Sequence, residues 1–327
     1  MRIGINGFGR IGRAVLRRAL RTDLDIVAIN DITDAATLAH LLKHDSTYGP
    51  LDLPVTASER ALEVNGHSIA ISGYADPAQI DWAGHDVELV IDATGRFRTR
   101  DALASHLKAG ARKVLLSAPG KGLDATIVPG VNDAAYDAAR HEIVSLASCT
   151  TNCVAPMVKV LHERFGLVRG FMTTIHAYTG DQMLLDAPHK DPRRARSAAV
   201  NIVPTTTGAA RMVGQVLPEL QGRLDGIAIR VPVEDGSITD LSAQLSRPAT
   251  AEEVNAAFAA AAEDQLHGIV RYSTAPLVSR DVIGDAASCV FDSALTQASG
   301  DLVKVFGWYD NEWGYANRLV EMAQRMA

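Results

Sequence analysis

The chain opens with Met1–Arg13, MRIGINGFGRIGR, in which an apolar run leads directly into closely spaced glycines. Gly7, Gly9 and Gly12 follow the pattern GxGxxG, between residues typical of a buried strand and residues typical of a helix. Glycines there permit a tight turn and a close approach of the backbone to a pyrophosphate, and the helix N-terminus supplies free N–H groups. The stretch therefore predicts a strand, turn and helix that bind a dinucleotide.

Asp31 ends the second predicted strand, nineteen positions after Gly12. In a dinucleotide-binding fold, an acid about 20 residues beyond the glycines accepts hydrogen bonds from the ribose hydroxyls and repels the 2′-phosphate of NADP. No arginine lies in the segment 30–33 to offset that repulsion. NAD is therefore predicted over NADP, and the alternative is a structural glycine turn followed by a capping aspartate.

The composition is that of an ordinary globular protein of about two domains, with 327 residues, 47% hydrophobic and 21% charged. A net charge of −6 argues against nucleic-acid binding, which normally needs a basic face. No apolar run approaches the ~18 residues of a membrane span, and the N-terminus lacks the pattern of a signal peptide. We expect a cytoplasmic protein with neither nucleic acid nor membrane as a partner.

The first half alternates apolar β-rich runs with helical stretches, which predicts a doubly wound, Rossmann-type parallel sheet in an α/β domain. The segment 51–86 has short alternating strands and an Asn65-Gly66 turn, which indicates an antiparallel insertion. Strands are predicted at Arg2–Asn6, Asp25–Asn30, Glu88–Ala93, Lys113–Ser117, Ala125–Val128 and Glu142–Ala147, and helices at Arg10–Arg21 and Ala35–Lys43.

The second half changes to long alternating strands with few helices, which predicts an α+β domain whose mostly antiparallel sheet carries helices on one face. We expect a dinucleotide-binding domain over 1–148, a catalytic domain over 149–310, and a last helix over 311–327 that packs back onto the first domain. Helices are predicted at Thr150–Phe165 and Ala251–Ala262, the latter after a capping box, and strands at Gly170–Tyr178, Gly226–Val233, Ser237–Leu245, Ile269–Ser273, Ser288–Asp292 and Leu302–Tyr309.

Cys149 lies in ASCTTNC (147–153), at the junction between a predicted strand and a predicted helix. A helix N-terminus favours the thiolate, and His176 at the end of the next strand could pair with it as imidazolium. The structural alternative is a buried core cysteine and a histidine with satisfied hydrogen bonds. The three cysteines, with Cys153 and Cys289, argue against a disulfide framework, and their spacing predicts no metal site.

Four segments together resemble the phosphorylating glyceraldehyde-3-phosphate dehydrogenases: INGFGRIGR (5–13), ASCTTNC (147–153), HAYTGDQ (176–182) and WYDNEWGY (308–315). The resemblance covers essentially the whole chain in the same order. It implies a glycolytic or gluconeogenic oxidoreductase that converts glyceraldehyde 3-phosphate and inorganic phosphate to 1,3-bisphosphoglycerate with NAD. It also implies a homotetramer.

By the same resemblance, Cys149 is the nucleophile that forms a thiohemiacetal and then a thioester, and His176 is its base. The family's other positions fall into three groups. They match Thr179, Asp181 and Arg230 around the C3 phosphate of the substrate; Ser148, Thr150, Thr207 and Gly208 around the attacking phosphate; and Gly7, Gly9, Arg10, Ile11, Gly12, Asp31, Ser117 and Asn311 at the cofactor.

The chain departs from the family pattern at Leu146, at Ala75 and in the run Val233–Gly236. Two other functions remain open. An erythrose-4-phosphate dehydrogenase would release the acyl group to water, although the intact attacking-phosphate positions favour phosphorolysis. A redox-sensing side role would use Cys153 as a resolving thiol. The basic stretch 189–196 is interpreted as a solvated loop, or by resemblance as a loop at a subunit interface.

Overall fold

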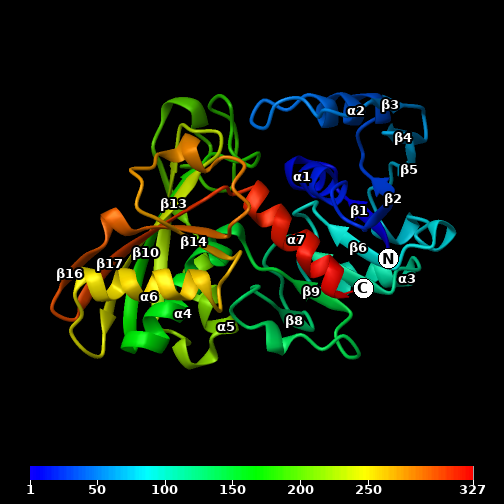
Figure 1. Ribbon diagram of the computed structural model, residues 1–327. Helices are drawn as coiled ribbons and strands as arrows, with labels where there is room; N and C mark the ends of the chain where they lie inside the picture. Colours follow the sequence, from blue (N-terminus) through cyan, green and yellow to red (C-terminus); the bar gives the residue numbers. More distant parts are fainter. Residues whose placement is uncertain (327) are drawn as a thin grey trace. The chain divides into compact units, whose positions relative to one another are not determined.

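The computed structural model describes residues 1–326, which form two compact units. The first unit comprises 1–127, 134–147 and 316–326, and the second comprises 128–133 and 148–315 (Figure 1). Residues 316–326, near the C-terminal end of the chain, thus belong to the unit that begins at Met1. Arg18 Nε donates to Asn317 Oδ1 at 2.6 Å within this first unit.

The sheet of the first unit has nine strands in the order β3-β4-β5-β2-β1-β6-β7-β9-β8. From β5 to β8 every neighbouring pair is parallel, while β3, β4 and β5 pair antiparallel as the predicted insertion. The bounds are β1 Arg2–Asn6, β2 Asp25–Asn30, β3 Val55–Ala57, β4 Ala61–Val64, β5 His67–Ser72, β6 Leu89–Asp92, β7 Lys113–Leu116, β8 Ala125–Thr126 and β9 Ile143–Ser145.

Helices cover both faces of this sheet, so its central strands are buried throughout. Asp34 caps the second helix by accepting a hydrogen bond from Thr37 N, and Thr99 caps the third in the same way. The turn between β4 and β5 has Asn65 and Gly66 at φ 51° and 78°, the left-handed conformations of a two-residue hairpin. The helices are α1 Arg10–Ala19, α2 Ala35–Lys43 and α3 Arg100–Lys108, and α7 runs from Trp313 to Met326. The predicted doubly wound class is confirmed.

A buried polar network crosses the centre of this unit. Trp82 Nε1 donates to His106 Nδ1 at 3.0 Å, so the proton of the neutral ring lies on Nε2, which donates to Asp92 Oδ2 at 3.1 Å. Asn6 Nδ2 donates to the same carboxylate oxygen at 2.9 Å. The network satisfies these interior groups and fixes the carboxyl ends of β1 and β6, beside the glycine turn.

The second unit is built on an eight-stranded mixed sheet, in the order β11-β12-β10-β13-β17-β15-β14 with β16 paired to β17. Only β10–β12 and β14–β15 are parallel. The strands are β10 Leu167–Ala177, β11 Val203–Thr206, β12 Leu224–Val231, β13 Ser237–Leu245, β14 Val270–Ser273, β15 Cys289–Asp292, β16 Gln297–Ser299 and β17 Leu302–Tyr309. The mostly antiparallel sheet is the one that the sequence predicts.

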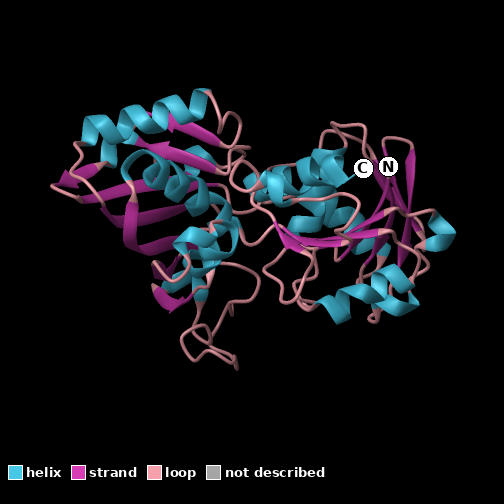
Figure 2. Ribbon diagram, turned by 90° about the horizontal axis from the view of Figure 1, so that it is seen from below, coloured by secondary structure: helices cyan, strands magenta, loops and turns pink. Residues whose placement is uncertain are grey.

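Three helices, α4 Cys149–Phe165, α5 Ala209–Val216 and α6 Ala251–Glu263, lie on one face of this sheet (Figures 1 and 2). Every second residue of β13 is buried beneath them. The capping box at the start of α6 is confirmed, since Thr250 and Glu253 exchange side-chain and backbone hydrogen bonds. Short 3₁₀ turns complete the chain at Pro77–Gln79, Ala83–His85, Asp133–Ala135, Ala198–Val200, Pro218–Leu220, Ser279–Val282 and Ser293–Leu295.

One predicted strand is shorter than expected, at the end of the first unit's sheet. The predicted strand Glu142–Ala147 is formed only over Ile143–Ser145, because Leu146 turns into the apolar interior and Ala147 takes φ 55°. Helices α3 and α5 and strands β11 and β16 were not predicted. Among residues 1–326, no helix has both the length and the apolar character needed to cross a membrane.

Replacing Asp92 with alanine should lower the free energy of unfolding by about 3 kcal/mol, because several buried donors would lose their acceptor. Thermal and denaturant unfolding measure the change. Asp52→Ala, at an exposed carboxylate of the same unit, is the control and should change stability little. Equal stability of the two variants would show that the network does not hold this unit together.

Candidate active site

Cys149 is the first residue of α4, and the local backbone explains why the helix begins there. Ala147 is in the left-handed conformation, which turns the chain sharply after β9. Ser148 then acts as the N-cap, with its Oγ accepting from Thr151 N at 3.1 Å. The half-buried thiol therefore lies at the positive end of a long helix.

His176 lies near the end of β10, buried to 4% exposure, and meets the cysteine directly. Its Nε2 is 3.6 Å from Cys149 Sγ. On the other side of the ring, Nδ1 is 2.7 Å from the carbonyl oxygen of Ala177. Residues that are 27 positions apart thus lie in contact, as the predicted nucleophile and base would need to.

Burial shifts the pKa of each member of this pair toward its neutral form. It raises the pKa of the Cys149 thiol to about 11, although the positive charge of Arg230 acts in the opposite direction. Burial, together with the same Arg230 charge, lowers the pKa of His176 to about 3. Desolvation thus acts against the thiolate that the helix end favours, and the contact between Sγ and Nε2 gives the thiol proton a direct route to His176.

Tyr309, at the end of β17, was not predicted and supports both residues. Its hydroxyl lies 2.9 Å from Thr150 Oγ1 and 2.8 Å from Thr174 Oγ1. Its ring packs edge-on against His176, with the ring centroids 5.8 Å apart. Burial raises the pKa of its hydroxyl, so it remains protonated. The hydroxyl of Thr150 is thus engaged by Tyr309.

The N-terminal turns of α4 and α5 lie side by side. Thr151 Oγ1, in the first turn of α4, donates to the carbonyl oxygen of Ala209 at the start of α5. Gly208 is the N-cap of α5, and the Thr207 hydroxyl accepts from Ala209 N at 3.1 Å. Two helix dipoles and their free N–H groups therefore converge near Ser148, which makes this end of the unit suitable for an anion.

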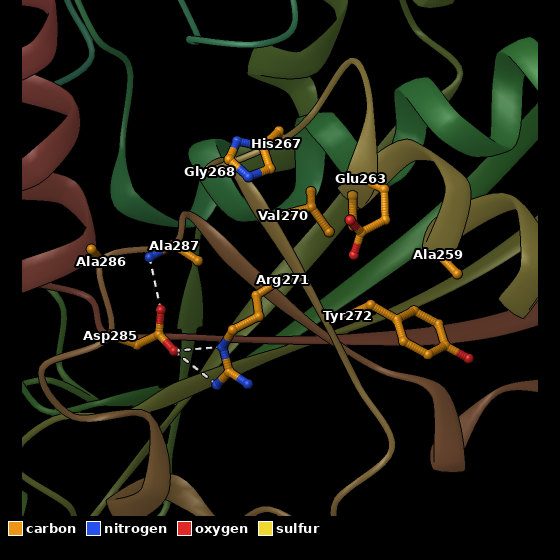
Figure 3. A pocket seen from close by; sticks show the side chains of 11 residues that line it. Ala259, Glu263, His267, Gly268, Val270, Arg271, Tyr272, Asp285, Ala286 and Ala287 are labelled. Atoms are coloured by element: carbon orange, nitrogen blue, oxygen red, sulfur yellow. Dashed lines mark hydrogen bonds and ion pairs between the residues drawn. The ribbon is translucent and has the colours of Figure 1, made fainter.

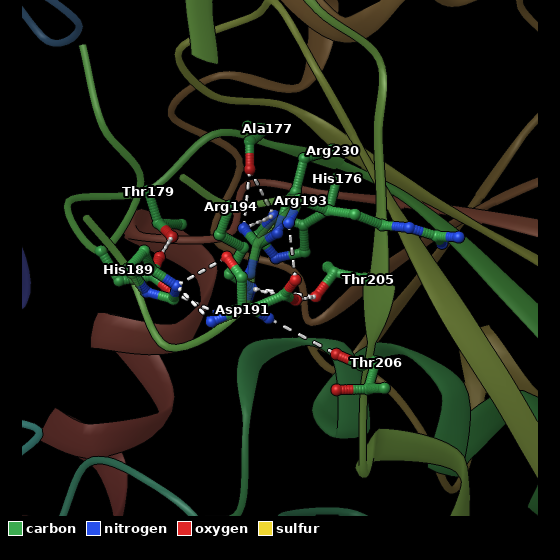
Figure 4. A network of polar contacts seen from close by, with 11 residues as sticks. His176, Ala177, Thr179, His189, Asp191, Arg193, Arg194, Thr205, Thr206 and Arg230 are labelled. Carbon is green, nitrogen blue, oxygen red and sulfur yellow. Dashed lines mark hydrogen bonds and ion pairs between the residues drawn. The ribbon is translucent and has the colours of Figure 1, made fainter. Parts of the chain in front are cut away.

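The loop after β10 carries a second polar cluster, drawn in Figure 4. Thr179 Oγ1 donates to Asp181, and the same carboxylate pairs with Arg194. Arg194 Nε also donates to Thr205 Oγ1 at 2.9 Å. Arg194 was missed from the sequence, where the basic stretch 189–196 is interpreted as a solvated loop. Its side chain is only 20% exposed and belongs to this cluster.

Arg230 lies on β12 directly opposite His176 on β10, in a parallel register. Its Nη1 is 2.8 Å from both Ala177 O and His176 Nδ1. Its buried Nε has no hydrogen-bond partner. Arg230 thus links the Cys149–His176 pair to the loop cluster and retains donors for an anion.

Asn311 is held from two sides, so its side chain has a fixed direction. Ser237 Oγ donates to Asn311 Oδ1 at 2.7 Å, and Asn311 N donates to Asp235 Oδ1 at 3.2 Å. Asp235 is a buried carboxylate in the run Val233–Gly236, where the sequence departs from the family pattern. Gly236 fits that run because its φ is 82° and a Cβ there would lie 2.2 Å from Ser279 O.

The glycine turn of the first unit lines a cavity of about 320 Å³ together with Asp31, Tyr74, Thr94 and Phe97. A Cβ on Gly12 would lie 2.3 Å from Gly7 O, while a Cβ on Gly9 would meet nothing within 4 Å. The turn is therefore closed on its inner side and open where a pyrophosphate approaches. These features fit a dinucleotide.

Asp31 lines that cavity, and its carboxylate is fixed there because it accepts hydrogen bonds from Phe8 N at 2.7 Å and Thr33 N at 2.9 Å. Other predicted cofactor residues do not line the cavity. Arg10 pairs with Asp45 at 2.5 Å, and Ile11, Gly12 and Ser117 lie outside the lining. Arg96 does line it, on a part of the chain that the sequence analysis left without a role.

A larger cavity, of about 480 Å³, lies between the end of α6 and β14 (Figure 3). It is lined by Glu263, His267 and Tyr272, and its arginine, Arg271, is already paired with Asp285 at 2.8 Å. None of the predicted site residues lines it. Size alone therefore does not locate the chemistry of this unit.

Cys153 does not take the position of a resolving thiol. It is fully buried, and its Sγ donates to Gly307 O at 3.4 Å. Burial and the neighbouring Cys289 raise its pKa well above the usual range. Both features disfavour the thiolate that thiol exchange needs, so the redox-sensing alternative loses its second cysteine.

Two family models match the chain. Residues 1–100 match the NAD binding domain of glyceraldehyde 3-phosphate dehydrogenase, and residues 148–311 match its C-terminal domain. Among similar proteins, glyceraldehyde-3-phosphate dehydrogenase of Geobacillus stearothermophilus is 54% identical, covering 100% of this chain and 98% of its own. The protein of the same name from Streptomyces coelicolor is 55% identical, covering 98% and 97%.

Asp235→Asn should increase the reactivity of Cys149, because the buried negative charge raises the pKa of the thiol while the amide oxygen can keep both backbone hydrogen bonds. The rate of alkylation by iodoacetamide at pH 8 should rise roughly threefold or more, since one pKa unit is a tenfold change in thiolate. Glu234→Gln, on the same turn but paired with Arg280, is the control. An unchanged rate in Asp235→Asn would remove this carboxylate from the electrostatics of the site.

Proposed function

The chain belongs to the glyceraldehyde-3-phosphate dehydrogenase family, as an NAD-dependent enzyme of glycolysis, and on that premise we propose that Cys149 and His176 perform its chemical step. The observation that carries the proposal is the 3.6 Å contact between Cys149 Sγ and His176 Nε2 in a buried site. NAD, when bound, supplies the hydride acceptor. The cavity at the glycine turn fits this cofactor, with Asp31 at the ribose.

His176 moves the protons of the reaction at Nε2. As Cys149 Sγ bonds to the aldehyde carbon, the thiol proton passes to Nε2 and then to the new alkoxide, which gives the thiohemiacetal. When the hydride leaves that carbon, Nε2 accepts the hydroxyl proton and the C–O bond becomes the carbonyl of a thioester. The direct contact between Sγ and Nε2 suits this order, since each proton moves to or from an atom beside the reacting sulfur.

The paired ends of α4 and α5 are proposed to hold the attacking phosphate. Ser148 and Thr207 would contribute hydroxyls there, and Thr150 and Gly208 backbone N–H groups, since the Thr150 hydroxyl contacts Tyr309. Phosphate oxygen attacks the thioester carbon, the C–S bond breaks, and the sulfur leaves as thiolate and regains its proton from His176. Phosphorolysis preserves the energy of the oxidation in an acyl phosphate, which hydrolysis of the thioester would lose.

Arg230 and Thr179 are proposed to receive the C3 phosphate of the substrate, with Asp181 beside them. Arg230 supports this assignment because its unpartnered, buried Nε and planar fork suit a phosphate. Asp181 would repel a phosphate directly, so its role is to position Thr179 and Arg194, both of which contact it. Arg194 joins the set as a second cation.

A homotetramer in the cytoplasm completes the proposal. The sheet face opposite α4, α5 and α6 exposes Phe171 (73%) and Ile227 (49%) on neighbouring strands. The loop between β10 and β11 adds Leu184, Leu185, Val200 and Ile202, all well exposed. Apolar side chains gathered in this way are typical of subunit interfaces, and the family resemblance supports four copies.

NADH formation from glyceraldehyde 3-phosphate and NAD should require inorganic phosphate. Omitting phosphate should slow turnover about tenfold or more, because a thioester in a dry site reacts slowly unless a nucleophile is positioned beside it. Cys149→Ala should lower the rate by about 10⁴-fold while leaving NAD binding intact. Turnover indifferent to phosphate would instead favour hydrolysis, as in an erythrose-4-phosphate dehydrogenase.

Cofactor choice provides a separate prediction. The kcat/KM for NAD should exceed that for NADP, and Asp31→Asn should reduce the ratio by about tenfold or more by removing repulsion of the 2′-phosphate. Asp34→Asn, which can keep the N-cap of α2, is the matched control. Comparable kcat/KM values for the two cofactors in the unmodified chain would contradict the role assigned to Asp31.

A further inference from the structure

We propose that Ser237 is a positioning residue that fixes the direction of the Asn311 side-chain amide, so that the amide presents N–H donors to the carbonyl oxygen of the nicotinamide carboxamide. The inference rests on the proposed function, because it takes NAD as the cofactor and Asn311 as a residue that meets it. It adds the residue that decides which atom of the amide faces the cofactor.

Ser237 is the first residue of β13, the strand that lies between β10 and β17. Its side chain is fully buried. Its Oγ accepts a hydrogen bond from Ala177 N at 3.1 Å and donates to Asn311 Oδ1 at 2.7 Å. One hydroxyl thus connects the backbone at the end of β10, directly after His176, to the amide of Asn311 beyond the end of β17.

The direction of these hydrogen bonds follows from the capacity of a hydroxyl. Ala177 N is always a donor, so Ser237 Oγ accepts from it and keeps its own proton to donate. If the Asn311 amide were turned over, Nδ2 would donate to the same oxygen. The buried O–H of Ser237 would then lack an acceptor among residues 1–326, because its two contacts would both be donors. Such an unmade hydrogen bond is destabilising, so Oδ1 faces Ser237.

Asn311 consequently directs the two protons of Nδ2 away from Ser237. Its backbone is held as well, since Asn311 N donates to Asp235 Oδ1 at 3.2 Å. The residue is only 5% exposed, yet its Nδ2 has no hydrogen-bond partner in the part of the chain that the structure describes. A nearly buried amide with two unused donors suits a ligand that offers an acceptor.

The nicotinamide end is the part of NAD that must come close to this amide. The ring has to lie beside the substrate carbon that is bonded to Cys149 Sγ, and that sulfur contacts His176. Asn311 is linked to the next residue, Ala177, through Ser237 alone. The carboxamide on the ring has one acceptor, its carbonyl oxygen, and donors on its nitrogen. The free donors of Asn311 therefore select the carbonyl oxygen.

Two analogues of NAD test this direction without any turnover. 3-Acetylpyridine adenine dinucleotide keeps the carbonyl oxygen and lacks the NH₂ group, whereas 3-aminopyridine adenine dinucleotide has an NH₂ group and no carbonyl. Isothermal titration calorimetry of the full chain gives the Kd of each analogue, with NAD as the reference. The acetylpyridine analogue should bind about tenfold or more tightly than the aminopyridine analogue, because it alone can accept from Nδ2. Equal Kd values in the unmodified chain would overturn the inference.

Ser237→Ala should reduce that preference about threefold or more, because the amide can then turn over. Ser242→Ala, on the other face of β13, is the matched control and should keep the preference of the unmodified chain. An unchanged ratio of Kd values in Ser237→Ala would show that the hydroxyl does not direct Asn311. Failure of NAD itself to bind the unmodified chain would instead overturn the proposed function.

Asn311→Asp provides a second test that leaves the contact between Ser237 and Ala177 in place. Ser237 can still donate to one carboxylate oxygen, and the other oxygen can only accept. The preference should therefore invert in favour of the aminopyridine analogue. The added negative charge acts on both pyridinium rings alike and cancels in the ratio of their Kd values. A retained preference for the acetylpyridine analogue would contradict the proposed direction of the amide.

Discussion

The contact between Cys149 Sγ and His176 Nε2 constrains most of the second unit. Helix α4 must begin at residue 149, which the Ser148 cap and the left-handed Ala147 ensure. Strand β10 must run straight to residue 176, which its pairing with β12 on one side and β13 on the other ensures. Tyr309 then holds the start of the helix through Thr150 and packs against the histidine ring. A shift of one residue in either element would separate the thiol from the imidazole.

Burial of that pair has two opposing consequences. It raises the pKa of the thiol and lowers that of the imidazole, so desolvation favours the neutral form of each group. A fixed cation cannot correct both shifts, because Arg230 stabilises the thiolate and destabilises the imidazolium.

The sequence predicts the parts of this arrangement that depend on local pattern. Strand–helix alternation and GxGxxG suffice for the doubly wound unit, Asn65-Gly66 for the hairpin, and ASCTTNC for the position of the thiol. Arg194 could not be found in this way, because its role comes from a fold of the loop that brings Asp181 and Thr205 to it. The raised pKa of Cys149 could not be predicted from the sequence either. A helix end favours the thiolate, and only the packing around the thiol shows that desolvation, which opposes the thiolate, is the larger effect.

The two proposed anion sites differ in the kind of charge that they offer, and the difference suits the reaction. The substrate's phosphate must remain bound from the first bond to release, and it meets the full charges of Arg230 and Arg194. The attacking phosphate must bind, react and leave as part of the product, and it meets hydroxyls, N–H groups and the partial charges of two helix ends. Exchanging the two chemistries would hold the second phosphate too tightly and the first too weakly. The placement of arginines around the β10–β11 loop, and of threonines and glycine at the start of α5, follows from this requirement.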